Sequence, residues 1–113
     1  MLPEYTTDEP TRAAIDALPG VTLLEFGSPY CGHCRRAEPL VEHALTGRSD
    51  LRHVRIFDGR GRPLGRSFGV KLWPTLDVLE DGVEKARFVR PQDAAPMVEA
   101  LKLYAAESGT ATA

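Results

Sequence analysis

Four short segments combine apolar and β-branched residues in a way typical of β-strands. They cover residues 21–26, 51–58, 75–80 and 83–90. The first is apolar except for Glu25, which is typical of a strand in the middle of a sheet. The second alternates and places Val54 and Ile56 on its buried face. An Asp-Gly pair between the last two segments predicts a tight hairpin.

Apolar positions at helical spacing predict three helices and one short helical turn. These are a helix capped by Thr7 or Asp8 that ends near Leu18, a helix that begins within 31–34 and stops at Gly47, a turn around 64–68, and a closing helix from Gln92 to about Ala106. The order of elements predicts an α/β fold with a mixed sheet and helices on both faces. One domain would span 1–106, and the polar residues 107–113 are expected to form a disordered tail.

Composition narrows the class of protein without naming a function. The chain has 113 residues, 42% of them hydrophobic and 27% charged, with a net charge of −2, as in an ordinary soluble domain. It contains no run of about 18 apolar residues, so we expect no membrane span. Residues 1–20 lack the basic and apolar regions of a secretory signal, so we expect a cytoplasmic protein. The arginine-rich stretch 52–67 lacks interleaved aromatic residues, so we expect a solvated loop and no nucleic-acid partner.

Both cysteines of the chain, Cys31 and Cys34, lie three positions apart. The pair is a redox couple, half of a metal site, or a coincidence of spacing. A disulfide across so short a loop would constrain the unfolded chain very little, which favours chemistry over a structural role. Zinc needs four ligands and the chain has no second cysteine pair, so we expect no metal.

The position of the pair at the start of a predicted helix gives each cysteine a separate role. The free N–H groups and the dipole at a helix N-terminus favour an anion there, and the thiolate is the attacking form of cysteine. Cys31 would lie at the helix tip, and Cys34 one turn further in and less exposed. We therefore expect Cys31 to attack a partner disulfide, and Cys34 to attack the resulting mixed disulfide and release the partner.

Features along nearly the whole chain, about residues 5–106, resemble the thioredoxin family. They are Glu25 six positions before Cys31, Tyr30 directly before it, the C-x-x-C pair itself, Pro39 five positions after Cys34, and the segment FGVKLWPT at 68–75. The resemblance implies a four- or five-stranded mixed sheet, a cis Pro74, no cofactor, and thiol–disulfide exchange with protein substrates. It also implies an electron donor such as a thioredoxin reductase.

Within that family, the residues between the cysteines are closer to the catalytic domains of protein disulfide isomerase. Those domains also carry C-G-H-C, here with Gly32 and His33, and a proline at the position of Pro29. An imidazole near the Cys31 thiolate would stabilise the reduced state. We therefore expect a reduction potential nearer about −180 mV than about −270 mV. The alternative is that His33 is an indifferent exposed turn residue.

Glu25 is the polar exception in an apolar strand. A buried, unpaired carboxylate would tend to stay protonated, and beneath the cysteines it could accept and return the proton of Cys34. The alternative is an acid at the strand edge that points to solvent. The lysine that often neighbours this acid in the family has no clear match, and Arg55 is the nearest candidate.

The resemblance also implies a substrate groove around Pro74. A cis Pro74 would place the backbone of Trp73 beside Cys31, where a substrate strand could pair with it. Tyr30 and Thr75 would flank this groove. Trp73 itself is either an apolar contact for substrates or a ring that covers the sulfurs.

Two arginines near the end of the last predicted strand have two alternative roles. Arg87 and Arg90 lie near the position of an arginine that approaches the active site in the isomerase domains. At Arg90, on the substrate-facing rim, a charge would favour partners with acidic surfaces. The alternative is that both are solvated strand-end residues.

The leading hypothesis is thus a thioredoxin-like oxidoreductase with Cys31, Cys34 and Glu25 as catalytic residues, active in electron transport to protein disulfides. A second is net oxidase or isomerase activity, which requires an oxidising compartment. A third, from another class, is a redox sensor or partner-binding module without turnover.

Overall fold

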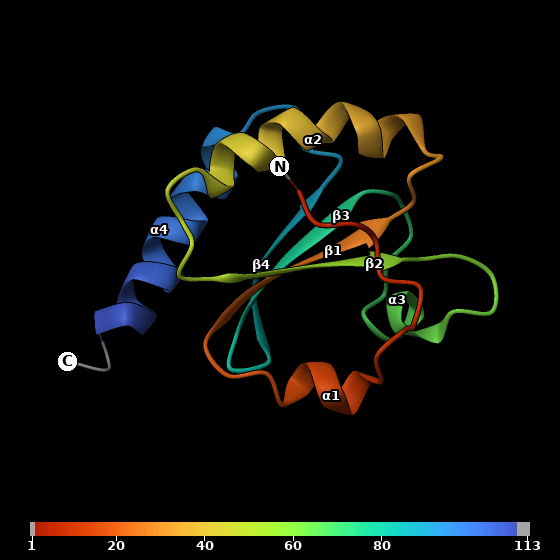
Figure 1. The fold of residues 1–113 in the computed structure, drawn as a ribbon, viewed down its shortest axis with the longest axis horizontal. Coiled ribbons are helices and arrows are strands. Elements are labelled where there is room, and N and C mark those ends of the chain that lie inside the picture. Colours follow the sequence, from red (N-terminus) through yellow and green to blue (C-terminus); the bar gives the residue numbers. More distant parts are fainter. Residues whose placement is uncertain (1, 111–113) are drawn as a thin grey trace.

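The computed structural model describes residues 2–110, and of residues 105–110 the backbone alone (Figure 1). It contains helices α1 (Arg12–Asp16), α2 (Gly32–Leu45), α3 (Pro63–Ser67) and α4 (Ala95–Thr110), and strands β1 (Val21–Gly27), β2 (Arg52–Phe57), β3 (Thr75–Glu80) and β4 (Val83–Val89). The predicted order of elements and the predicted α/β class are confirmed. No helix within the described part of the chain is both long and apolar enough to cross a membrane.

The four strands form one mixed sheet in the order β2-β1-β3-β4. Strand β1 runs parallel to β2 and antiparallel to β3, and β3 and β4 form the antiparallel hairpin. Outside β2, Thr6 forms a single parallel bridge with Ile56, and its N–H donates to the Arg55 carbonyl at 2.7 Å. The sheet therefore has four strands and one bridge at its edge, where the sequence allowed four or five strands.

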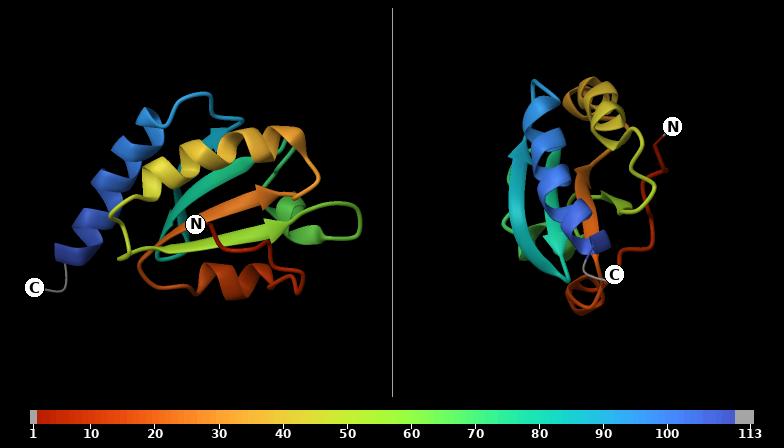
Figure 2. Two further views of the ribbon diagram at one scale, coloured as in Figure 1. Left: turned by 45° about the horizontal axis from the view of Figure 1, so that its top comes forward. Right: turned by 90° about the vertical axis from the view of Figure 1, so that its left-hand side faces the viewer.

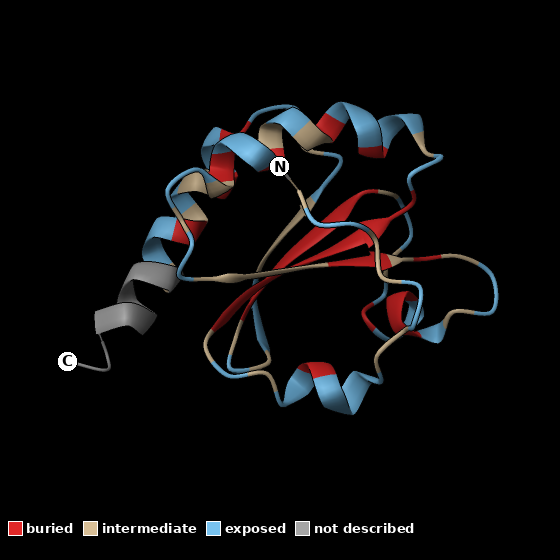
Figure 3. Ribbon diagram, viewed as in Figure 1, coloured by how far each residue is buried: buried red, intermediate tan, exposed pale blue. Residues whose placement is uncertain are grey.

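Helices cover both faces of the sheet, with α2 and α4 on one side and α1 and α3 on the other (Figures 1 and 2). Alternate residues of β1 divide between the two cores, since Leu23 packs with α2 and α4 while Leu24 and Phe26 pack with α1 and α3. All of β1 is buried, as Figure 3 shows for the centre of the sheet. Glu25 shares the face of Leu23, so its side chain lies beneath α2.

The first helix is shorter than predicted. Its N-cap is Thr11, which accepts a hydrogen bond from the Ala14 N–H at 3.1 Å, rather than Thr7 or Asp8. The chain before it is held by other contacts, because the Thr7 carbonyl accepts from Arg62 at 2.8 Å and the Glu9 side chain accepts the Leu64 N–H at 3.0 Å. Polar residues suited to capping therefore precede the helix without starting it.

The last helix starts later and ends later than predicted. The side chain of Asp93 accepts the Ala95 N–H at 3.2 Å, so the helix begins at Ala95 and not at Gln92. It continues to Thr110, so the predicted tail overlaps the helix over 107–110. The remainder of that tail, 111–113, lies outside the described residues.

Candidate functional site

The two cysteines occupy different environments at the start of α2. Cys31 is the N-cap of the helix and is half-buried, and its N–H donates to the Ser28 carbonyl at 3.2 Å. Cys34 lies one turn further along, and 0% of its surface is exposed. Both are free thiols. This is the placement that the sequence predicts, with one sulfur at the helix tip and one beneath it.

The environment of Cys31 stabilises its thiolate. Burial opposes ionisation of this thiol, but hydrogen bonds from the backbone N–H and the thiol of Cys34, the backbone N–H of His33 and the charge of Arg90 together lower its pKa. Most of these contributions come from the helix N-terminus itself. Cys31 is thus the more nucleophilic of the two sulfurs.

Cys34 has the opposite character. Burial, together with the neighbouring Cys31, raises its pKa to about 11, although hydrogen bonds from the Ser28 backbone and the Tyr5 hydroxyl act in the other direction. At neutral pH this sulfur keeps its proton. Any reaction in which Cys34 attacks therefore requires a group that removes that proton.

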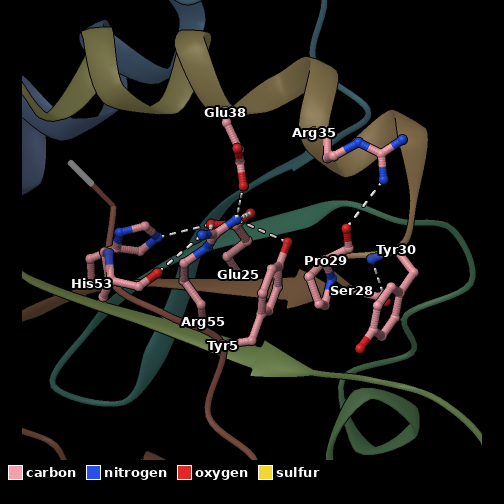
Figure 4. A network of polar contacts seen from close by, with 10 residues as sticks. Tyr5, Glu25, Ser28, Pro29, Tyr30, Arg35, Glu38, His53 and Arg55 are labelled. Carbon is pink, nitrogen blue, oxygen red and sulfur yellow. Dashed lines mark hydrogen bonds and ion pairs between the residues drawn. The ribbon is translucent and has the colours of Figure 1, made fainter.

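A buried charged network lies beneath α2 and centres on Glu25 (Figure 4). Glu25 is 0% exposed, so the interpretation of a solvent-facing strand-edge acid is wrong. Arg55 on β2 donates to both of its carboxylate oxygens, at 3.0 and 3.2 Å, and His53 Nε2 lies 2.9 Å from Oε1. The expectation of an unpaired carboxylate is also wrong, because Arg55 supplies the charge that a buried carboxylate needs.

Arg55 joins this network to the cysteines through Tyr5. Its guanidinium donates to the Tyr5 hydroxyl at 2.9 Å and to Glu38 at 3.0 Å, and it lies 4.0 Å from the centre of the Tyr5 ring. The Tyr5 hydroxyl in turn is hydrogen-bonded to the side chain of Cys34, and burial together with Glu25 raises its pKa. Gly27 makes room for this contact, because a Cβ there would lie 2.6 Å from Cys34 Sγ and 3.1 Å from Tyr5 Oη.

Three members of the network, Tyr5, Glu38 and His53, were not predicted as site residues. His53 and Arg55 alternate with the apolar positions of β2, which is the pattern of a strand with one solvent face. Here α2 covers that second face, so the polar residues are buried. The sequence does not indicate a role for Tyr5, because its hydrogen-bond partner Arg55 lies 50 positions away along the chain.

His33 contributes to the site through its backbone. Its N–H is directed at Cys31, while its exposed imidazole Nδ1 lies 2.9 Å from Arg36. The charge of Arg90, with desolvation and Arg36, lowers the pKa of this imidazole, which favours its neutral form. Gly32 is the first residue of α2 and has open space around its Cα. Tuning of the redox potential by His33 and Gly32 stays a prediction.

The loop that contains Trp73 and Pro74 is held by Arg90. The Trp73–Pro74 peptide bond is cis, and Pro74 is buried. Arg90 donates its backbone N–H to the Pro74 carbonyl at 2.9 Å and its Nε to the Trp73 carbonyl at 2.8 Å. Its φ of 48° is in the left-handed region that most residues avoid. Arg87 instead pairs with Asp77, so of the two arginines Arg90 is the one at this loop.

The other predicted groove residues are placed as follows. The Trp73 indole N–H donates to Asp58 at 2.9 Å, which fixes the ring on the side of that carboxylate. Thr75 is buried and donates its hydroxyl to the Leu72 carbonyl at 2.7 Å. Tyr30, which directly precedes Cys31 in the sequence, is 82% exposed. Contact of these side chains with a substrate stays a prediction.

Replacement of Arg90 by glutamine is expected to raise the pKa of Cys31 and to slow its alkylation at neutral pH by about twofold, because an exposed positive charge is lost near the thiolate. The pKa of His33 should rise as well, since Arg90 is the main cause of its depression. The pH dependence of Cys31 alkylation and the NMR titration of His33 measure the two shifts. Lys85→Gln, which removes an exposed charge from β4, is the control. Unchanged profiles for Arg90→Gln would contradict this electrostatic contribution.

Comparison with known proteins identifies relatives over almost the whole chain. The family model described as Thioredoxin matches residues 4–103. Among curated proteins, protein disulfide-isomerase A3 of Gallus gallus is 30% identical over 106 residues, which is 93% of this chain and 21% of the relative. The chain thus spans about a fifth of the length of the curated relatives it matches.

Solved structures show the same fold. Thioredoxin 2 from Pseudomonas aeruginosa PAO1 in its reduced form is 45% identical, with a TM-score of 0.84 and coverage of 95% of this chain and 99% of that one. A mutant thioredoxin from Halobacterium salinarum NRC-1 is 27% identical, with a TM-score of 0.68 and coverage of 81% of this chain and 80% of that one. The likeness therefore extends to the arrangement of the elements over most of the chain.

Proposed function

The chain belongs to the thioredoxin family, and from that premise we propose that it is a thiol–disulfide oxidoreductase that exchanges a Cys31–Cys34 dithiol for the disulfides of protein substrates. The observation that carries this proposal is the difference between the two thiols. The pKa of Cys31 is lowered at a helix tip, while the pKa of Cys34 is raised to about 11 directly beneath it. In such a pair, one sulfur is the nucleophile that attacks the substrate, and the other stays protonated until it resolves the mixed disulfide.

The reaction proceeds in two exchanges. The Cys31 thiolate attacks one sulfur of the substrate disulfide, a mixed disulfide forms, and the first substrate thiolate leaves. Cys34 then loses its proton and attacks Cys31 Sγ, so the Cys31–Cys34 disulfide forms and the second substrate thiolate leaves. Two electrons pass from the dithiol to the substrate. The reverse sequence inserts a disulfide.

Glu25 is the proposed acceptor for the proton of Cys34. It is buried on the face of β1 beneath α2, the helix that carries Cys34. Its ion pair with Arg55 offsets the cost of burying a carboxylate where water is excluded. The Tyr5 hydroxyl stabilises the Cys34 thiolate by hydrogen bonding as the proton leaves.

The substrate side of the site favours acidic protein segments. His33, Arg36 and Arg90 line an open groove of about 700 Å³ whose walls include no acidic side chain among the described residues. The backbone N–H of Trp73 is the proposed pairing site for an extended substrate segment, since the Trp73 carbonyl already accepts from Arg90. A thioredoxin reductase or a similar donor would return electrons to the disulfide.

A net oxidase or isomerase direction is the second candidate, and the disulfide-isomerase relatives favour it. A lowered Cys31 pKa stabilises the reduced form of the couple and makes its disulfide a stronger oxidant. The chemistry of the two exchanges is the same in either direction. The surrounding thiol pool decides which one dominates.

Insulin reduction with dithiothreitol as the electron donor tests the proposed function. We expect each protein molecule to reduce many insulin disulfides, because the dithiol is regenerated after every cycle. Cys31→Ser should be inactive in the same assay. Oxidation of one dithiol per protein molecule without further turnover would instead identify a redox sensor or binding module.

A further inference from the structure

His53 is a titratable residue in hydrogen-bond contact with Glu25, and the proposed reaction assigns it no role. It lies two positions before Arg55 on β2, so both side chains point to the face beneath α2. Its Nε2 is 2.9 Å from Glu25 Oε1, and its side chain is 7% exposed (Figure 4). Of the side chains that hydrogen-bond to Glu25 in the described structure, His53 alone can gain and lose a proton, since an arginine keeps its own.

The far side of the His53 ring faces a different environment. Its Nδ1 is buried and has no hydrogen-bond partner within the described residues. His53 also lines an open cavity of about 590 Å³ between the N-terminal segment and α2, together with Pro39, Glu42, His43 and Thr46. A buried polar atom of this kind is satisfied most readily by water. His53 therefore lies between the enclosed Glu25 carboxylate and an open cavity.

We propose that His53 carries protons between Glu25 and the water of this cavity during each redox cycle. The proposal rests on the proposed function, because it requires that Glu25 receives the proton of Cys34. In the tautomer that carries its proton on Nδ1, the ring accepts that proton at Nε2 from the acid form of Glu25 and releases the Nδ1 proton to water. Meanwhile the Cys34 thiolate forms its bond to Cys31 Sγ, and the substrate sulfur leaves with the electron pair of the broken bond. Glu25 returns to the carboxylate form. Reduction of the disulfide runs the same transfers backwards, so water returns a proton to Nδ1 and the starting tautomer is restored.

Replacement of His53 by glutamine distinguishes a proton relay from a purely structural hydrogen bond, because glutamine can form the hydrogen bond but cannot transfer the proton. The amide nitrogen of glutamine reaches about as far as His Nε2 and can donate to Glu25, so the ion network keeps its contact. An amide does not pass a proton from one side to the other at neutral pH. His53→Gln therefore removes proton transfer while leaving the buried carboxylate hydrogen-bonded.

The test follows a single turnover of the reduced protein with excess insulin, stopped by acid and analysed by intact mass. In His53→Gln we expect resolution of the mixed disulfide to slow by about tenfold, so that this species accumulates, while the initial attack by Cys31 keeps its rate. Added imidazole, which can enter the open cavity, should restore resolution. His43→Gln removes a histidine from the same cavity wall without touching Glu25 and should behave as the wild type.

Two results would overturn the relay. Resolution at the wild-type rate in His53→Gln means that protons leave Glu25 by another route. Slow resolution that imidazole does not restore means that His53 acts only as a hydrogen-bond partner. Failure of the wild-type protein to reduce insulin at all is a separate result, since it contradicts the proposed function and removes the premise of the relay.

Discussion

Replacement of Arg55 by methionine is expected to lower the free energy of unfolding by about 3–5 kcal/mol, the cost of leaving a buried charge without its partner. The side chain of Glu25 is 0% exposed and that of Arg55 is 5% exposed, so neither charge is hydrated. Arg55 also holds the Tyr5 hydroxyl, the Glu38 carboxylate and the Pro3 carbonyl. Its loss leaves Glu25 with His53 as its remaining hydrogen-bond partner in the described structure.

Denaturant unfolding of the reduced protein measures this loss without a contribution from the disulfide. Glu25→Met/Arg55→Met should be more stable than Arg55→Met alone, because removal of both charges leaves no unpaired ion. Arg60→Met, in an exposed loop, is the matched control and should change stability by less than about 0.5 kcal/mol. Additive effects of the two single replacements would show that the buried pair does not couple.

Most of the fold could be predicted from local patterns. The apolar segment 21–26 is a central strand, and the Asp-Gly pair forms the hairpin between β3 and β4. The ends of helices were less predictable, since they depend on contacts made elsewhere in the chain. Thr7 and Asp8 are suitable capping residues, yet the helix begins at Arg12, and Thr7 and Glu9 instead contact Arg62 and Leu64.

The site could be predicted only where the residues are close in sequence. Cys31 and Cys34 are placed by the start of one helix, so their spacing and the helix signal were sufficient. Glu25 was found because it interrupts an apolar strand, but its partners lie on another strand. Arg55 was named as the nearest candidate for a basic neighbour of Glu25, and His53 had the pattern of a solvent-facing residue. Burial of such residues depends on which face α2 covers, which is a property of the whole fold.

Replacement of Cys34 by serine is expected to lower the rate at which a single turnover without added thiol releases reduced insulin, by at least about a thousandfold. Serine has nearly the size of cysteine, so the buried position remains filled. Its hydroxyl does not attack a disulfide, so the second exchange cannot occur. The first exchange uses Cys31 alone and should continue, because the helix N-terminus and Arg90 still stabilise its thiolate.

The variant Cys31→Ser supplies the matched control. It keeps Cys34, but that sulfur is fully buried and its pKa is raised to about 11, so it should form no adduct with a protein substrate. The two variants thus carry one thiol each and differ only in its position. Any difference between them reports the separate roles of the two sulfurs.

The most direct test of these roles is the intact mass of Cys34→Ser after incubation with an oxidised protein substrate under non-reducing conditions. The account predicts a stable one-to-one adduct linked through Cys31, which dithiothreitol removes and which Cys31→Ser does not form. Absence of an adduct in Cys34→Ser, or an equal adduct in Cys31→Ser, would contradict the assignment of Cys31 as the nucleophile and Cys34 as the resolving thiol.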